Sequence, residues 1–283
     1  MKRAVIIASA KGGLGKSTTA RVFVDLARKA ARRVAAWDLD TGTGSLAIVY
    51  ESRDPEVGCA SEDVRDRKAR GAWLDSLYGD ADDVVLDVPG GAMNDLLRFA
   101  DGAAHLVEEM KLAGREVVVV SVIGTQRDST LTPQNAIDTF GASVHHVVVK
   151  NGHYGDEDQF VVYDGFDDPE SGERKFGNTA TVVREAGGEV VFMRRLNVDA
   201  MQVLDLKGMT FAEGEFAAAR IGRRWSSSVR HWLQDVEEAF AGTWLSANGE
   251  IAEHGSGSPA AAIKKPKRRG EQRGEVGEQL ATA

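Results

Sequence analysis

The 283-residue sequence contains a single cysteine, Cys59, and has no uninterrupted apolar run of 18 residues. One thiol excludes a disulfide framework within the chain and is typical of a protein that works in a reducing cytoplasm. The lack of long apolar runs excludes a transmembrane helix, and the first apolar run, residues 4–7, is too short for a signal-peptide core. We therefore expect a cytoplasmic protein that does not insert into membranes.

The chain also lacks an excess of positive charge, because 43 acidic residues outnumber 35 basic ones and the formal net charge is −8. A protein that coats nucleic acid over its whole surface would be basic, so any nucleic-acid contact has to come from a local patch. The hydrophobic content of 42% and the charged content of 28% are ordinary for a globular protein. The length suits one large α/β domain with extensions.

The glycine-rich segment ASAKGGLGKST, residues 8–18, carries the strongest chemical signal. It lies between an apolar run and an amphipathic stretch, which predicts a strand, a loop and a helix. Backbone N–H groups at such a helix start bind phosphate, and glycines let the backbone approach the oxygens closely. Lys16 can reach the β- and γ-phosphates, and the Ser17 hydroxyl can ligate Mg²⁺. We predict a nucleotide site with contacts from Gly12, Gly13, Leu14, Gly15, Lys16, Ser17 and Thr18.

This loop departs from the standard P-loop, which has glycine at the place of Ala10, and it carries an additional lysine, Lys11. In both respects it resembles the deviant Walker A motif, KGGxGK[ST], of the ParA/MinD superfamily of ATPases. The resemblance implies ATP and Mg²⁺ as cofactors. It also implies that Lys11 reaches the phosphates of a partner subunit in an ATP-dependent homodimer. The alternative for Lys11 is a solvated loop lysine without such a role.

Two further predicted strands end in carboxylates. Residues 33–40, RVAAWDLD, form an apolar run typical of a buried parallel strand, with Asp38 and Asp40 at the end where ligands bind in open α/β sheets. Residues 84–91, VVLDVPGG, are typical of a Walker B strand and a switch loop. The resemblance implies that Asp40 positions the attacking water, that Asp38 helps to organise Mg²⁺ and the loop, and that Asp87 holds Mg²⁺. Helix capping is the alternative for the first two aspartates.

Alternating strand and helix patterns through the first 200 residues predict a doubly wound, mostly parallel sheet with helices on both faces, the P-loop NTPase fold. We expect Asp82 and Asp83 at the solvated start of the Walker B strand. Further strands are expected at 116–122, 143–149 and 189–192, helices at 93–112 and 133–140, and a long amphipathic helix at 213–245.

Asn151 follows the predicted strand 143–149 and resembles the strand-end asparagine with which many superfamily members read the adenine edge. An asparagine before a glycine is equally a turn residue, so both interpretations stay open. Residues 152–180 form an acidic insertion, in which we expect a solvated loop with a small hairpin around 160–163. We assign no chemistry to this insertion.

Four arginines lie on the polar side of the predicted late helix, and superfamily members that partition plasmids bind DNA non-specifically through basic residues on late helices. The cluster is therefore a candidate DNA contact, and a solvated helix face is the alternative. Its members are Arg220, Arg223, Arg224 and Arg230.

From residue 248 onward, the composition shifts to small and charged residues. We therefore divide the chain into an ATPase domain, 1–247, and a disordered basic tail, 248–283. The block KKPKRR in the tail offers further phosphate contacts. The tail lacks the apolar helix face by which MinD proteins hold membranes, so we expect no membrane partner.

Two functions fit these features. The first is a ParA-like ATPase whose ATP-dependent homodimer acts as a positioning or partition switch on DNA or a DNA-bound adaptor. Slow ATP hydrolysis resets this switch. Lys11, Lys16 and Asp40 would be its catalytic residues, and its compact form resembles plasmid stability or mobilisation members. The alternative is a metabolic ATP-dependent ligase or amidase on the same fold, similar to dethiobiotin synthetase or cobyrinate amidase. Such enzymes generally lack the lysine found at position 11.

Overall fold

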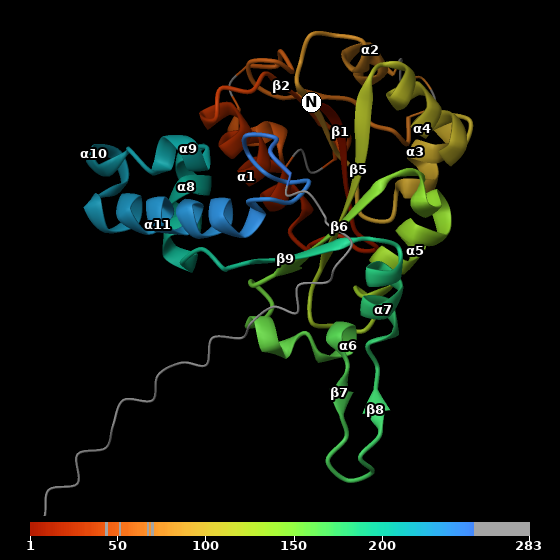
Figure 1. The fold of residues 1–283 in the computed structure, drawn as a ribbon. Coiled ribbons are helices and arrows are strands. Elements are labelled where there is room, and N and C mark those ends of the chain that lie inside the picture. The colour runs from red at the N-terminus through yellow and green to blue at the C-terminus, as the bar shows by residue number, and fades with distance from the viewer. Residues whose placement is uncertain (43–44, 51, 67, 69–70, 252–283) are drawn as a thin grey trace, which may run out of the picture. The chain divides into compact units, whose positions relative to one another are not determined.

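The computed structural model describes residues 1–42, 45–50, 52–66, 68 and 71–251. Its centre is a seven-stranded sheet in which every neighbouring pair of strands runs parallel (Figure 1). In order across the sheet, the strands are β3 (Ala60–Ser61), β2 (Val34–Asp38), β4 (Asp83–Asp87), β1 (Lys2–Ala8), β5 (Arg115–Ile123), β6 (His145–Asn151) and β9 (Glu189–Met193).

Helices cover both faces of this sheet (Figure 1). Strand β1 shows the division, because Val5 and Ile7 pack into one hydrophobic core while Ala4 and Ile6 pack into the other. The predicted doubly wound fold is thereby confirmed. The first core contains α1 (Lys16–Lys29), α8 (Val198–Lys207), α9 (Phe211–Gly214), α10 (Ala218–Ile221) and α11 (Arg223–Phe240), and the second contains α2 (Ala72–Leu77), α3 (Met93–Phe99), α4 (Ala103–Leu112) and α5 (Leu131–Phe140).

Two predicted helices are interrupted in the structure. The expected helix 93–112 breaks between α3 and α4, where Asp101 and Gly102 adopt φ of 56° and 112°. The expected helix 213–245 is three helices, α9 to α11, and Gly222 with φ 87° separates the last two. A positive φ is incompatible with a right-handed helix, so the chain changes direction at these positions while its apolar side chains still reach the core.

The predicted hairpin around 160–163 is wrong. These residues form the helix α6 (Val161–Asp164), because Phe160 and Tyr163, three positions apart, are both buried beside α7 (Asn178–Glu185). A hairpin does occur later in the insertion, where β7 (Phe166–Asp167) pairs antiparallel with β8 (Arg174–Lys175). It projects from the end of the molecule that carries α6 (Figure 1).

The expectation of a solvated start to β4 is wrong for Asp83, whose side chain is fully buried. Arg3 and Arg32 each donate two hydrogen bonds to its carboxylate. Asp82, one residue earlier, keeps 31% of its side chain exposed. The first carboxylate of β4 lies inside the protein because Arg3 and Arg32 replace water as its hydrogen-bond donors.

The C-terminal part of the described chain packs back onto the domain, and Ile251 forms a β-bridge with Gly242. The domain boundary placed at 247 stays a prediction. The tail from residue 252 and its basic block lie outside the described residues. Among the helices that the structure describes, none combines the length and apolar character needed to cross a bilayer.

Asp25 links three elements in the first core. Its Oδ1 accepts a hydrogen bond from the Tyr50 hydroxyl at 2.9 Å, and its Oδ2 accepts from the backbone N–H groups of Phe211 and Ala212 at 2.7 and 3.1 Å. Burial raises the pKa of Asp25 to about 6, and these hydrogen bonds, with the nearby charge of Arg21, oppose the rise. The ionised carboxylate is thus held inside the protein at neutral pH at a net cost.

Because of this carboxylate, we expect the stability of the fold to depend on pH in a way that Asp25→Asn removes. The folded-state pKa of about 6 exceeds the ordinary 3.8. The contribution of Asp25 to the unfolding free energy is therefore largest below pH 3.8 and is lost as the pH rises through 6. The difference in unfolding free energy, wild type minus Asp25→Asn, should fall by about 2 kcal/mol between pH 4.5 and 7.5. Urea denaturation at several pH values measures it. A difference that does not vary with pH would contradict the prediction.

Candidate nucleotide-binding site

The loop between β1 and α1 has the backbone of an anion site. Gly13 and Gly15 adopt φ of 80° and 92°, and Gly15 precedes the first residue of α1. A Cβ on Gly15 would lie 2.1 Å from the Nδ2 of Asn151, so only glycine fits there. The first turn of α1 contains no acidic residue, which leaves the positive end of a 14-residue helix available to an anion.

Three neighbouring elements hold this loop in shape. The Ala10 N–H donates to Thr132 Oγ1 on α5 at 2.9 Å, and the Gly91 N–H of the switch loop donates to the Ser9 carbonyl at 3.2 Å. The Asn151 amide donates to the Leu14 carbonyl at 2.9 Å. A loop fixed by separate elements does not have to be ordered by its ligand, which favours binding.

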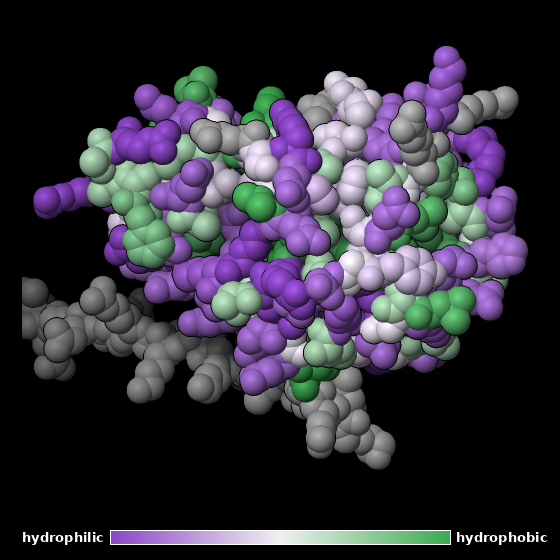
Figure 2. Space-filling model, turned by 90° about the horizontal axis from the view of Figure 1, so that it is seen from above, coloured by the Kyte–Doolittle hydropathy of each residue, from purple (hydrophilic) through white to green (hydrophobic). Residues whose placement is uncertain are grey.

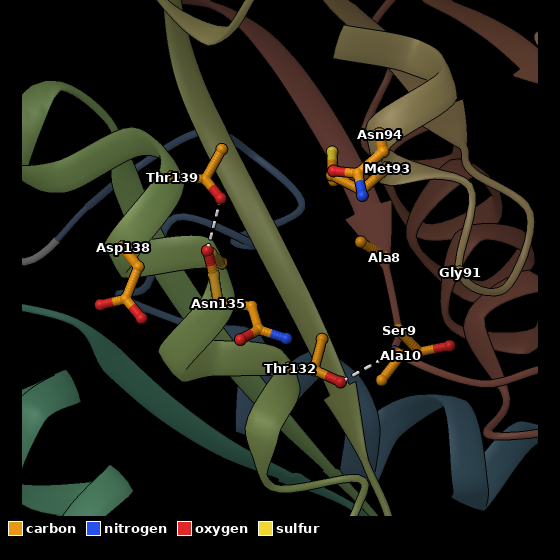
Figure 3. A pocket seen from close by; sticks show the side chains of 11 residues that line it. Ala8, Ser9, Ala10, Gly91, Met93, Asn94, Thr132, Asn135, Asp138 and Thr139 are labelled. Atoms are coloured by element: carbon orange, nitrogen blue, oxygen red, sulfur yellow. Dashed lines mark hydrogen bonds between the residues drawn. The ribbon is translucent and has the colours of Figure 1, made fainter. Parts of the chain in front are cut away.

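The switch loop lies directly against the phosphate loop. A Cβ on Gly90 would lie 2.4 Å from the Gly12 backbone nitrogen, so this contact requires glycine. A cavity of about 370 Å³ lies beside it, between the end of β1, the switch loop and α5, and Figure 3 shows the side chains that line this cavity. The switch loop therefore has open space on one side. The labelled residues of its wall are Ala8, Ser9, Ala10, Gly91, Met93, Asn94, Thr132, Asn135, Asp138 and Thr139.

Lys16 and Asp87 lie together beneath the loop. Lys16 is buried, and burial lowers the pKa of its ammonium group, although the charges of Asp87 and Asp40 oppose the shift. Burial raises the pKa of Asp87 to about 7, a hydrogen bond from Ser17 opposes this, and the negative charge of Asp38 adds to it. The site thus places the Lys16 ammonium group and several carboxylates close enough to shift one another's pKa.

The residues present fit a Mg²⁺ ion. Asp87 Oδ1 is buried and has no hydrogen-bond partner among the described residues, a costly arrangement that a cation would relieve. The described part of the chain contains no group of three His, Cys, Asp or Glu side chains able to hold a metal. Mg²⁺ in nucleotide sites needs few protein ligands, because phosphate oxygens and waters complete its shell. Ser17 and Asp87 would be those ligands.

Asp38 is paired in register with Asp87 on the neighbouring strand, but its oxygens are engaged elsewhere. Oδ2 accepts from the N–H groups of Leu46 and Ala47 at 2.9 Å each, and Oδ1 accepts from the Asp40 N–H at 3.0 Å. These contacts favour its expected role in organising the loop. Its role toward Mg²⁺ stays a prediction.

Asp40 lies at the mouth of the site, with 23% of its side chain exposed. Its Oδ1 accepts a hydrogen bond from the Gly42 N–H at 3.2 Å and lies 3.7 Å from the Arg65 guanidinium. Its charge is also felt by Lys16. A carboxylate that is near Lys16 and open to solvent can contact water, as the predicted role of positioning the attacking water requires.

Lys11 extends from the loop into solvent, with 58% of its side chain exposed, and forms an ion pair with Asp128. Asp128 belongs to the segment between β5 and α5 and was not among the predicted site residues. The two residues are 117 positions apart, and nothing in the local pattern links them. The role of Lys11 in a partner subunit stays a prediction.

A second cavity of about 320 Å³ opens on the other side of the loop, where Gly13, Gly15 and Thr18 form one wall. Asn151 lies in this wall, and its Oδ1 accepts the His153 N–H, so it serves the turn as well as the loop. Its contact with adenine stays a prediction. The remaining walls were not predicted from the sequence, and they are His153, Tyr154, Arg195, Leu196, Val198, Met201, Gln202 and Trp232.

Tyr154 belongs to the insertion to which we assigned no chemistry. Its hydroxyl donates to the Gly13 carbonyl, and its ring packs against Gly124. The insertion therefore reaches the phosphate loop through its first residues. The mainly apolar lining beside the loop suits a flat aromatic base.

Comparisons with known proteins give a match to a nucleotide-binding domain and similarities to individual proteins. The model of the CobQ/CobB/MinD/ParA nucleotide-binding domain matches residues 5–175. Protein MobD of Acidithiobacillus ferrooxidans is 28% identical over 196 residues, 67% of this chain and 76% of MobD. The cell division ATPase MinD of Pyrococcus furiosus is 18% identical with a TM-score of 0.46, over 83% of this chain and 100% of that one. A ParA family ATPase from Chlorobium tepidum TLS is 14% identical with a TM-score of 0.49, over 83% of this chain and 99% of that one.

Proposed function

This chain belongs to the CobQ/CobB/MinD/ParA nucleotide-binding family, and on that premise we propose that it is a cytoplasmic ATPase that dimerises with ATP and Mg²⁺ and acts as a switch on DNA or a DNA-bound adaptor. Hydrolysis resets the switch. The likeness to a protein named MobD supports placing it among the plasmid stability or mobilisation members.

The observation that carries this proposal is the contrast between two lysines of one loop. Lys16 is buried near Asp87 and Asp40, where it can serve the nucleotide of its own subunit. Lys11 points outward and is held by an exposed ion pair with Asp128. Exposed ion pairs contribute at most about 1 kcal/mol, so little free energy opposes its transfer to the phosphates of a second subunit.

The chain's own groups divide the chemistry between them. Backbone N–H groups of the loop and the start of α1 bind the phosphates, and Lys16 neutralises their charge. Ser17 and Asp87 would hold Mg²⁺, which would supply positive charge to the phosphate oxygens. Asp40 orients water at the mouth of the site, while the loop that Asp38 organises keeps Asp40 in place.

We expect Asp40→Ala to bind ATP, to hydrolyse it at least about 100-fold more slowly, and to accumulate as a dimer. Light-scattering mass with ATP and with ADP, together with single-turnover hydrolysis, measures this. Adding duplex DNA at low and high salt tests the DNA contact, because phosphate binding weakens as salt rises. A protein that stays monomeric under every condition would move the assignment to the metabolic ligase or amidase.

A further inference from the structure

One surface of the molecule is not used by the nucleotide site. Phe216 lies between α9 and α10 and exposes 73% of its surface, in the part of the chain that carries the four arginines. Figure 2 shows apolar side chains among strongly hydrophilic ones at the left end of the molecule, where Figure 1 places α9, α10 and α11. We call this the arginine–phenylalanine surface, made of Phe216, Arg220, Arg223, Arg224 and Arg230.

Ion pairing within the fold does not account for these arginines. Arg223 and Arg224 begin α11, where the helix dipole disfavours positive charge by about 0.3–1 kcal/mol each. No ion pair joins any of the four to a carboxylate in the part of the chain that the structure describes. Their charge is therefore available to a ligand.

Local contacts position this charge around the exposed ring. Arg230 donates to the Glu215 carbonyl at 2.9 Å, and its guanidinium carbon lies 5.8 Å from the centre of the Phe216 ring. Arg223 lies seven positions before Arg230 and shares its face of α11. The surface thus combines a ring open to solvent with guanidinium groups that are suited to phosphate.

This combination distinguishes between kinds of nucleic acid. In a duplex, the faces of the bases are covered by stacking, so the arginines could contact its phosphates while Phe216 would find no free base. A single strand offers both phosphates and unpaired base faces, and aromatic stacking contributes about 1–3 kcal/mol per base. We propose that the arginine–phenylalanine surface binds single-stranded nucleic acid, with one base stacked on Phe216 and the backbone on the arginines. This refines, and rests on, the proposed contact with DNA.

The test measures binding of the full chain, in the presence of ATP, to a fluorescent 20-nucleotide oligothymidine and to a 20-base-pair duplex. Phe216→Ala should weaken single-strand binding about 5- to 150-fold and change duplex binding less than about twofold. Phe216→Tyr keeps a stacking ring and should bind the single strand as wild type does. Leu206→Ala is the matched control, because Leu206 on α8 is also apolar and 85% exposed but lies outside the surface.

The arginines provide a second readout. Arg223→Ala should weaken binding to both nucleic acids and reduce the salt dependence of each by about one phosphate contact. If Phe216→Ala leaves single-strand binding unchanged, or weakens both ligands equally, the stacking inference is wrong while the proposed switch on DNA survives. The stacking inference is also wrong if the protein binds anionic phospholipid vesicles but neither nucleic acid. If the wild-type protein binds no nucleic acid although its ATP-dependent dimer forms, the proposed DNA contact itself is wrong, and a protein adaptor is left as the partner.

Discussion

Lys16→Ala is expected to weaken ATP binding at least about 100-fold, because it removes the buried positive charge at the first residue of α1. A hydrogen bond to a charged group contributes about 1.5–3 kcal/mol, and Lys16 can make more than one. The substitution also removes the cation that offsets the charge of Asp87, and it leaves Asp40 with Arg65 but without the nearby charge of Lys16. Repulsion between these carboxylates and the phosphates then adds to the loss. Calorimetric titration with Mg-ATP measures the affinity, and thermal denaturation without nucleotide checks that the variant folds.

Lys11→Ala is the matched control, since it makes the same change in the same loop at an exposed position. We expect its affinity for ATP to stay within about threefold of wild type, because exposed ion pairs contribute at most about 1 kcal/mol. It should nevertheless fail to dimerise with ATP. Equal losses of ATP affinity in both variants would mean that Lys11 serves its own subunit, and the dimer proposal would lose its basis.

The fold could be predicted because its signals are local. Unalternating apolar runs such as Val84–Leu86 are typical of parallel strands covered on both faces, and the structure confirms the sheet. The loop between β1 and α1 was likewise predictable, because its glycines adopt the positive φ that such a turn requires. Strand β3 was missed, since two residues are too few to show a period.

The parts of the site that could not be predicted from the sequence arise from long-range packing. Tyr154 meets the loop 141 positions away, and Asp128 meets Lys11 across 117. Neither lies in a pattern that differs from an ordinary surface loop. The cavity wall formed by residues 195–202 exists only because the segment after β9 passes beside α1 and α11. Such contacts depend on topology, which a local pattern does not specify.

The buried Asp83 shows the same limitation with a larger energetic consequence. It was expected in solvent because an aspartate pair at a strand start is usually hydrated. In the structure, Arg3 and Arg32 enclose its carboxylate with four hydrogen bonds of 2.6–2.9 Å. Burial alone would raise the pKa of Asp83, but the hydrogen bonds and charges of the two arginines outweigh it and hold the pKa below its ordinary value. The ionised form therefore stabilises the fold above that ordinary pKa, and this contribution is lost on acidification.

Arg3 also connects this carboxylate to the C-terminal segment. Its side chain is fully buried, and its Nη1 donates to the carbonyls of Trp244 and Ser246 at 3.0 and 2.9 Å. Asp83→Ala would leave a buried guanidinium without its counter-charge, which typically costs about 3–5 kcal/mol. We expect an unfolding free energy lower by that amount, measured by urea denaturation at pH 7.

Asp82→Ala is the control, because it removes the neighbouring carboxylate from a partly exposed position. Asp82 accepts one backbone hydrogen bond from Arg33 at 2.9 Å, and its side chain lies 3.8 Å from that arginine. Its loss should cost about 1 kcal/mol. If Asp83→Ala costs no more than this, water must reach Arg3 when the carboxylate is removed. The connection between β1 and the C-terminal segment would then depend on the apolar packing of Leu245 rather than on the buried charges.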